Sequence, residues 1–184
     1  MSCRNACDEE ILLMTVSTPL RALTGALALA LSLGLAGPAA AETLSLERYF
    51  KGRTEATGSF RAINGVKRYF MVGLDGKVKG RTLTLREDFY YADGERDRKT
   101  WRFERTGPNT YRGTREDVVG ETTVTIEGRT ARFTYLVDID PSPKKNIVRF
   151  HDRMVLKAGG RLENRALVTK FGLPVAWTRV DFTR

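Results

Sequence analysis

Cysteine and histidine are almost absent from this chain, and their scarcity excludes several kinds of site. The 184 residues include 2 cysteines and 1 histidine. Cys3 and Cys7 stand close to the N-terminus, so the chain beyond them has no disulfide, no thiolate nucleophile and no cysteine metal ligand. The sequence has no His, Asp and Glu cluster at metal-ligand spacing, and His151 belongs to no catalytic-triad motif. We therefore expect neither a metal site nor a Ser-His-Asp triad.

Glycine-rich phosphate loops are missing as well. Neither G-x-x-x-x-G-K followed by Ser or Thr nor G-x-G-x-x-G occurs in the sequence. The adjacent carboxylates Glu87 and Asp88, like Glu116 and Asp117, are candidates for acid–base work. Neighbours on an extended strand point to opposite faces, however, so neither pair can share one site if it is extended. The sequence assigns no catalytic residue and no cofactor.

Long apolar runs are also scarce, and the one that exists lies near the N-terminus. A Leu/Ala run over Ala26–Leu35 follows Arg21 and precedes small residues that end at Ala41. A basic residue, a short apolar stretch and an A-x-A ending are the parts of a secretory signal peptide. The run is shorter than the roughly 20 residues that a bilayer span needs. We predict cleavage after Ala41 and a single domain over 42–184, with a retained N-terminal helix as the alternative.

The residues before this run predict a later translation start. Signal peptides do not normally begin with acidic residues, yet Glu9 and Glu10 precede the apolar run. A start at Met14 removes them, and we predict Met14 as the initiator. We predict that the mature protein is exported to the periplasm.

The charge of the predicted mature chain is strongly positive. Removing the two arginines and three acidic residues of residues 1–41 from the chain's 31 basic and 22 acidic residues leaves a formal net charge of +10. An exported protein meets little nucleic acid, so we expect no nucleic-acid partner. We expect instead a lipid or another anionic envelope component, with peripheral membrane contact. The alternative is a solvated basic surface, which the even spread of basic residues along the chain favours.

Alternation with a period of two residues dominates after a short amphipathic segment, Leu44–Phe50. Asn64-Gly65 and Asp93-Gly94 are strong type I′ hairpin signals, and a bulge or break is expected at Asp75-Gly76. The predicted strands span 53–63, 66–78, 81–91, 96–105, 110–116, 121–126, 129–138, 146–157, 161–171 and 175–182. The pattern predicts an all-β fold, an antiparallel up-and-down barrel of about ten strands, lipocalin- or calycin-like, with a short N-terminal helix. The alternative is a curved, open half-barrel.

Alternation predicts an apolar face on three strands. These faces are Leu83, Leu85, Glu87, Phe89 and Tyr91 on 81–91; Ala131, Phe133, Tyr135 and Val137 on 129–138; and Val148, Phe150, Asp152, Met154 and Leu156 on 146–157. The sidedness of 175–182 is ambiguous.

Two carboxylates interrupt strand faces that are otherwise apolar. Glu87 lies between Leu85 and Phe89, and Asp152 lies between Phe150 and Met154. A buried carboxylate needs a partner or a cavity. The candidate partners are Arg102, Arg165, Lys170 and Arg179. Two interpretations stay open, namely a polar group that orients a ligand inside the barrel and an ion pair that fixes strand register. His151 falls on the opposite face from Asp152 and is expected at the surface.

Three blocks of residues resemble those of a known family. They comprise Glu87-Asp88-Phe89-x-Tyr91-x-Asp93-Gly94 with Trp101; Thr106-Gly107, Tyr111-x-Gly113-Thr114 and Asp117-Val118-Val119-Gly120; and Phe150-x-Asp152-x-Met154, Leu162-x-Asn164-Arg165-Ala166 and Lys170-Phe171-Gly172. Together with the Leu46–Gly52 opening, they resemble an uncharacterised bacterial envelope family, Domain of Unknown Function 3833. The blocks occur in order over the whole predicted mature chain.

This resemblance implies no activity and no catalytic residues. It implies that members are often lipoproteins with a Leu-Ala-Gly-Cys lipobox. Here Pro38 follows Leu35-Ala36-Gly37 in place of the cysteine, so we expect a protein that is not acylated and is soluble in the periplasm.

The leading hypothesis is non-catalytic binding of a hydrophobic or amphipathic anionic ligand, such as a lipid or fatty acid. The candidate ligand-binding residues are Glu87, Tyr91, Trp101, Tyr111, Asp117, Asp152, Asn164, Arg165 and Lys170. The second hypothesis is a structural or interaction protein of the envelope without a small ligand. The third is a barrel enzyme of the isomerase or cyclase kind, for which Tyr91, Tyr111, Asp152 and Asn164 would have to converge in one pocket.

Overall fold

A computed structural model describes residues 43–139 and 146–184. In these residues a short helix, α1 (Leu46–Phe50), precedes ten antiparallel strands. The strands are β1 (Gly52–Ala62), β2 (Lys67–Lys79), β3 (Thr82–Tyr91), β4 (Arg96–Gly107), β5 (Thr110–Thr114), β6 (Thr122–Glu127), β7 (Thr130–Asp138), β8 (Ile147–Leu156), β9 (Leu162–Lys170) and β10 (Leu173–Thr183). A single 3-10 turn (Ala158–Gly160) joins β8 to β9. The predicted signal peptide and the Met14 start lie outside the described residues.

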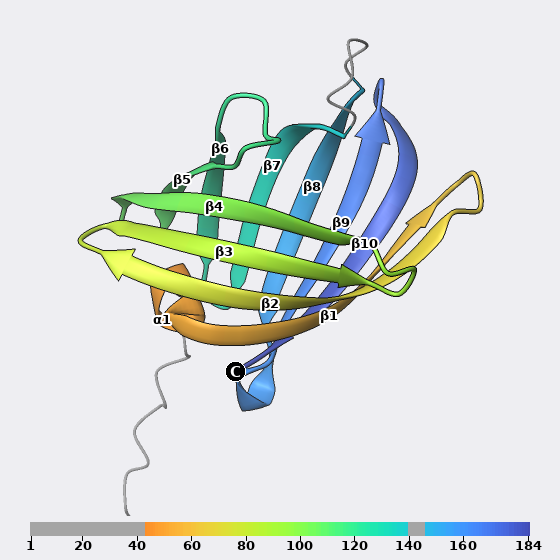
Figure 1. Cartoon of the computed structure of the whole chain (residues 1–184). Helices are drawn as coiled ribbons and strands as arrows, with labels where there is room; N and C mark the ends of the chain where they lie inside the picture. Colours follow the sequence, from red (N-terminus) through yellow and green to blue (C-terminus); the bar gives the residue numbers. More distant parts are fainter. Residues whose placement is uncertain (1–42, 140–145) are drawn as a thin grey trace, which may run out of the picture. The chain divides into compact units, whose positions relative to one another are not determined.

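Each strand pairs with its neighbours in the chain, and β1 also pairs with β10, so the sheet closes into a barrel (Figure 1). The prediction of an up-and-down barrel is confirmed, and the open half-barrel is wrong. Among the described strands, closure leaves no edge free to pair with another chain.

The predicted hairpin turns and the predicted break in β2 have different outcomes. Hairpins form at both predicted places, but their turns are not of type I′. Gly65 and Gly94 each have a φ of +89°, whereas Asn64 and Asp93 have negative φ values, and a type I′ turn requires positive φ at both positions. The break at Asp75-Gly76 is wrong, because β2 runs unbroken and Gly76 pairs with Gly52. This glycine has another purpose. A Cβ at Gly76 would lie 1.7 Å from the carbonyl oxygen of Phe50, so only glycine lets the end of α1 sit against β2.

Helix α1 covers one end of the barrel. Ser45 caps it by accepting a hydrogen bond from the Arg48 backbone N–H. The Tyr49 hydroxyl donates to the carbonyl of Phe182 and accepts from the N–H of Leu162, both at 3.1 Å. These bonds tie the helix to β9 and β10. Its apolar side chains, Leu46 and Phe50, are buried beneath the barrel interior.

A polar network locks the same end. Glu47 accepts hydrogen bonds from Arg105 at 2.9 Å and from the hydroxyl of Tyr111 at 2.6 Å. Burial raises the pKa of Glu47, but these two hydrogen bonds, together with those from the Glu47 backbone and Ser45, outweigh it and bring the pKa to about 2. Glu47 is thus ionised in the folded protein and joins α1 to β4 and β5.

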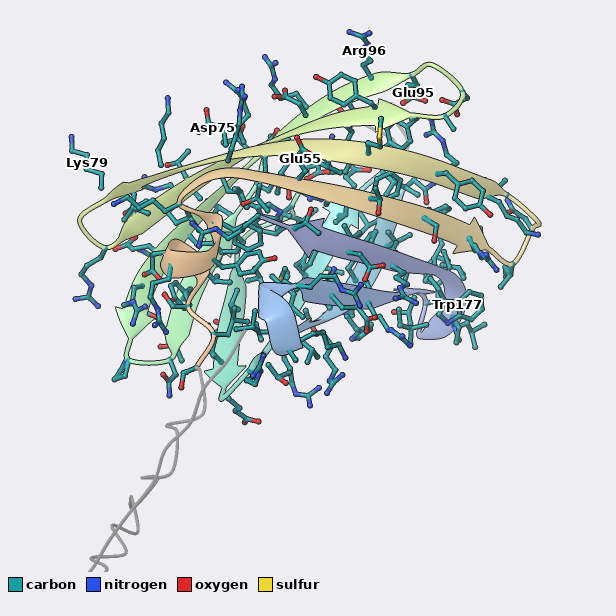
Figure 2. All side chains as sticks on the ribbon, turned by 90° about the horizontal axis from the view of Figure 1, so that it is seen from below. Glu55, Asp75, Lys79, Glu95, Arg96 and Trp177 are labelled. Carbon is teal, nitrogen blue, oxygen red and sulfur yellow. The ribbon has the colours of Figure 1, made fainter. Side chains whose placement is uncertain are left out.

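Strand alternation places one face of each strand inside the barrel. The inward faces predicted on β3, β7 and β8 are confirmed by their burial patterns. The sequence left β10 ambiguous, and the structure turns Ala176, Thr178, Val180 and Phe182 inward. Trp177 points outward, as do Lys79 and Arg96 on other strands (Figure 2). The register shift between Pro174 and Ala176 also brings Val175 to the interior.

The other end of the barrel is open. It is formed by the β1–β2, β3–β4, β5–β6 and β9–β10 turns and by the described ends of the β7–β8 connection. Side chains from these segments line the entrance to the interior: Ile63, Asn64, Val66, Val119, Ile139 and Asn146. Within residues 43–139 and 146–184, no helix has the length and apolar character needed to cross a membrane.

Candidate ligand-binding cavity

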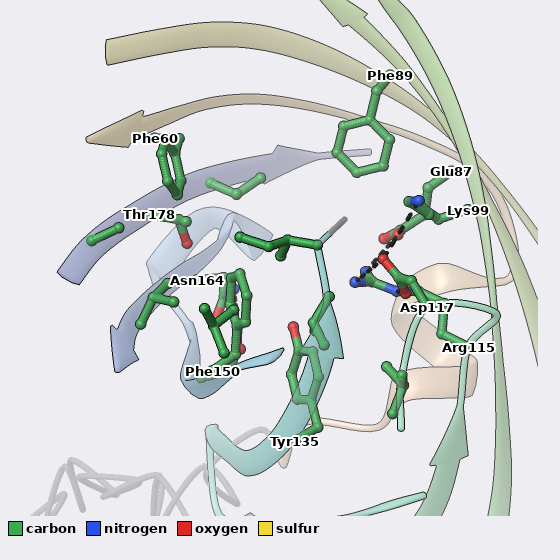
Figure 3. A pocket seen from close by; sticks show the side chains of 18 of the residues that line it. Phe60, Glu87, Phe89, Lys99, Arg115, Asp117, Tyr135, Phe150, Asn164 and Thr178 are labelled. Atoms are coloured by element: carbon green, nitrogen blue, oxygen red, sulfur yellow. Dashed lines mark hydrogen bonds and ion pairs between the residues drawn. The ribbon is translucent and has the colours of Figure 1, made fainter. Parts of the chain in front are cut away.

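The barrel is hollow between α1 and its open end. The cavity has a volume of about 1140 Å3, slightly above the roughly 300–1,000 Å3 common for small-molecule sites. Leu46 and Phe50 form its floor. Most of its wall is aliphatic or aromatic, and charged and polar side chains from β3, β4, β8, β9 and the segment after β5 interrupt it (Figure 3). An apolar molecule of moderate size fits this space.

Two groups of aromatic rings line the wall. On one side, Tyr135 stacks on Phe150 at 5.5 Å and meets Trp101 edge-on at 5.2 Å. On the other side, Phe70 packs against Phe89 and Tyr91 at 5.7 and 5.6 Å. Such rings expose large, rigid apolar faces at little cost in conformational entropy. They favour a ligand with flat or extended apolar parts.

The first polar group of the wall is centred on Arg115, at the end of β5. Its Nε donates to Asp117 at 2.6 Å, and its Nη1 lies 3.7 Å from Glu87 Oε2. The guanidinium also stacks over the Trp101 ring, with Cζ 4.7 Å from the centroid. Lys99 lies 3.5 Å from Asp117 on the same side (Figure 3). These contacts hold Arg115 against the wall.

The pKa of Glu87 is raised in this setting. Burial raises the pKa of Glu87 to about 7, and the nearby positive charge of Arg115 opposes this shift only in part. Asp117, Glu116 and Asp152 raise it further by repulsion. The wall near Glu87 therefore gains or loses a proton near neutral pH.

The second polar group joins β8 to β9. The Asn164 Nδ2 donates to Asp152 Oδ1, and the two side chains are only 8 % and 6 % exposed. The other oxygens, Asp152 Oδ2 and Asn164 Oδ1, have no hydrogen-bond partner. Burial raises the pKa of Asp152 to about 6, while the hydrogen bond from Asn164 and the nearby Tyr135 hydroxyl act in the opposite direction.

Most of the residues predicted to bind a ligand lie on this wall. The cavity is lined by Glu87, Tyr91, Trp101, Asp117, Asp152, Asn164 and Lys170. Tyr111 lies beneath the cavity with Glu47, and Arg165 lies outside the barrel, paired with Glu163. A ligand-binding role for any of them stays a prediction.

The predicted partners of the two buried carboxylates are wrong. Glu87 is paired with Arg115, and Asp152 with Asn164. The proposed cations go elsewhere, because Arg165 and Arg179 pair with Glu163, Arg102 reaches Thr82, and Lys170 bonds Asn146. The three arginines stand on outward positions, from which a long cationic side chain reaches solvent more easily than the interior. Lys170 lines the cavity but is bonded to Asn146.

Sequence reasoning missed Arg115 and Tyr135 as wall residues of functional interest. Arg115 shares strand parity with Tyr111 and Gly113, which places it on the inward side just past β5. Tyr135 already belonged to a predicted inward face, and its hydroxyl was the signal that it could contribute polarity there. Counting parity to the strand end finds both residues.

His151 lies on the outer face of β8 between Thr134 and Thr169, as expected. The four residues named for an enzyme do not converge. Asp152 and Asn164 are bonded to each other, Tyr91 stands beneath Arg68, and Tyr111 is outside the cavity. This arrangement does not support the enzyme hypothesis. In the described parts of the chain, no group of three His, Cys, Asp or Glu side chains could hold a metal ion.

A family model described as "Protein of unknown function (DUF3833)" matches residues 37–184. The chain belongs to the DUF3833 family. The resemblance seen in the three sequence blocks is thus confirmed. No curated protein sequence matches this DUF3833 protein.

Solved structures with similar barrels share little sequence with it. The DUF3833 barrel is similar to the S-type phycobiliprotein lyase CPES from Guillardia theta, with a TM-score of 0.54, 10 % identity and coverage of 77 % of this chain and 93 % of that chain. A structure of EF1p2_mFAP2b bound to DFHBI matches with a TM-score of 0.39, 9 % identity and coverage of 74 % and 94 %. The first of these shows the shared barrel fold.

Proposed function

We propose that this DUF3833 protein is a non-catalytic carrier that binds a hydrophobic or amphipathic molecule of the lipid class in its barrel. The observation that carries the proposal is the open cavity of about 1140 Å3 with its aromatic wall. A small barrel without a ligand function is normally filled by its own side chains. In this barrel the inward side chains do not fill the interior, although strands of this length could bury a solid core.

Exposed apolar side chains at the rim of the open end support the proposal that the ligand comes from a lipid surface. Phe171, Leu173 and Ile63 are 93 %, 69 % and 66 % exposed at the β9–β10 and β1–β2 turns. Phe171 has a φ of +52°, a conformation that costs a residue with a side chain about 1 kcal/mol. The ring contacts little beyond Lys170, whose Nζ lies 5.7 Å from the ring centroid, so it adds little to folding stability. Such strain is typical of residues kept for binding.

Basic side chains beside the apolar tips indicate the kind of surface that the rim would contact. Arg61, Lys67 and Lys170 stand beside the apolar tips, and none has an ion-pair partner among the described residues. Apolar tips flanked by basic side chains match the interface of an anionic lipid bilayer. We therefore assign the rim to peripheral contact with such a membrane. An anionic end of the ligand would meet Lys170 at this mouth, since the deeper wall carries carboxylates.

The proposed location is the periplasm, where an exported carrier would meet envelope lipids. The alternative of an envelope protein without a small ligand has no comparable support, because it gives no reason for the hollow interior.

The experiment is native mass spectrometry of the protein exported to a periplasm and purified without detergent. Thr178→Trp places a large ring in the cavity, and Thr125→Trp places the same ring on the exposed outer face of β6 as the matched control. We expect a lipid-range mass to accompany the wild type and Thr125→Trp, but not Thr178→Trp. Protein without any adduct in all three, even after incubation with envelope lipid extract, would contradict the proposal.

A further inference from the structure

The cavity wall contains two buried hydrogen-bond acceptors that nothing in the described protein satisfies. They are Asp152 Oδ2 and Asn164 Oδ1, which belong to side chains joined by one hydrogen bond. Both side chains line the cavity, and both are more than nine-tenths buried. A third unpaired oxygen, Thr54 Oγ1, does not line it. The unsatisfied acceptors of the cavity wall thus lie at one place.

A purely structural pair does not explain this arrangement. Buried polar atoms in folded proteins are almost always satisfied by protein, ordered water or ligand, because an unpaired acceptor loses its hydration without compensation. If these positions only filled space, two apolar side chains would stabilise the fold better than this polar pair. Asp152 and Asn164 instead use one bond to orient each other and leave one oxygen each.

No cation of the described residues is placed to use these oxygens. Arg115 affects Asp152 electrostatically, but its own hydrogen bonds go to Asp117. The Tyr135 hydroxyl also favours the charged form of Asp152, but it makes no hydrogen bond to Asp152 Oδ2. Phe150 and Met154 flank Asp152 on β8, and the rest of the surrounding wall is largely apolar (Figure 3).

The geometry points to a ligand whose apolar skeleton carries a hydroxyl or N–H donor, which it presents to Asp152 Oδ2 and Asn164 Oδ1. This inference rests on the proposed function and narrows its ligand. A plain hydrocarbon, an ester or an ether offers these oxygens no proton. A carboxylate at this depth would be repelled by Asp152, so an anionic group belongs at the mouth. A molecule with two donors, or an ammonium group, satisfies both oxygens.

The chain offers a local reporter for the test. Trp101 is on the cavity wall, 4 % exposed, and Trp177 is on the outer face. These are the 2 tryptophans of the sequence, so Trp177→Phe leaves emission from the cavity alone. In this background, dodecanol and dodecyl methyl ether are titrated while the Trp101 emission is recorded. The two probes differ in the donor and have similar apolar length.

We expect dodecanol to bind about tenfold more tightly than the ether, the effect of one hydrogen bond to a charged acceptor. In the double variant Asp152→Leu/Asn164→Leu, both probes should bind with affinities within about twofold of each other, because both acceptors are gone. Arg153→Leu, on the outward face of the same strand, is the control and should keep the preference. Thermal unfolding checks that each variant is folded. If the double variant does not fold, Asp152→Asn replaces it and should reduce the preference severalfold by removing the charge.

The outcomes separate the inference from the function beneath it. Equal affinity for the two probes in the parent protein overturns the inference and leaves the carrier function standing. A preference that persists in the double variant also overturns it, because the donor would then be bound elsewhere. No binding of either probe, with no lipid adduct in the native mass spectrum, overturns the carrier function itself.

Discussion

The carbonyl oxygen of Phe50, at the end of α1, occupies the space where a side chain at Gly76 would begin. A Cβ built there would lie 1.7 Å from that oxygen. The contact fixes how closely the helix approaches β2 and hence where Leu46 and Phe50 close the cavity. One glycine in a strand thus determines the floor of the proposed binding site.

Gly76→Ala should therefore destabilise the barrel and loosen its floor. Overpacking of this kind costs about 1–3 kcal/mol, and backbone cannot yield as a flexible side chain can. Urea unfolding measures the loss. Gly73→Ala, on the same strand, is the control, because a Cβ there meets nothing within 4 Å. Equal stability of the two variants would show that α1 can move away from β2 without cost.

The two carboxylates of the wall predict a dependence of stability on pH. Burial raises the pKa of Glu87 to about 7 and that of Asp152 to about 6, from ordinary values of 4.5 and 3.8. Between these limits the folded protein holds more protons than the unfolded chain, so stability falls as the pH rises. We expect a loss of about 1–3 kcal/mol between about pH 5 and pH 8. Each tenfold change in proton affinity corresponds to about 1.36 kcal/mol, and relaxation of the charged wall reduces the sum.

Glu87→Gln tests this assignment. The variant should be more stable than the wild type at about pH 8 and should show a flatter profile, because the charge that burial penalises is gone. Chemical unfolding at a series of pH values measures both. Glu121→Gln, at an exposed position, should leave the profile unchanged. A profile that is equally steep in Glu87→Gln would assign the titration to another group.

The Glu47 network beneath the cavity predicts a pH dependence of the opposite sign, in which stability falls as the pH falls. The pKa of Glu47 is lowered to about 2, so its stabilisation is complete above about pH 4.5 and is lost as the pH falls through about 2. Glu47→Gln should cost about 1 kcal/mol at neutral pH, since Arg105 is partly exposed and solvent screens the pair. The difference from the wild type should vanish near pH 2. A cost that persists there would come from packing and not from charge.

The fold was predictable because its signals are local. Period-two alternation, the glycines of the Asn64-Gly65 and Asp93-Gly94 turns and the lack of crossover helices all specify a meander of strands. Closure follows from the number of strands, since a long curled sheet gains by pairing its two edges. Gly76 misled the prediction because its close contact is with α1, which is distant in the sequence beyond β1.

The site was predictable only in part. Strand parity placed Glu87 and Asp152 inside, since a one-residue slip would expose the whole face. Their partners depend on which strands meet across the barrel and on how loops return to it, and neither is encoded by periodicity. Arg115 reaches Glu87 from the segment after β5, a contact that no spacing in the sequence reveals. The hollow interior also depends on the summed volumes of inward side chains from all the strands.

The strained tip of the β9–β10 turn provides the last prediction. Phe171 and Gly172 both have positive φ values, +52° and +82°, and such a turn favours Asn at the first position. Phe171→Asn should therefore raise stability by up to about 1 kcal/mol and, at the same time, weaken binding to vesicles of phosphatidylglycerol severalfold in sedimentation assays. Met71→Ser, which removes an exposed apolar side chain from the outer wall of β2, is the control and should bind as the wild type does. Unchanged binding of Phe171→Asn would remove the rim from membrane contact, because a ring that inserts into the bilayer interface cannot be replaced there by a polar amide without loss.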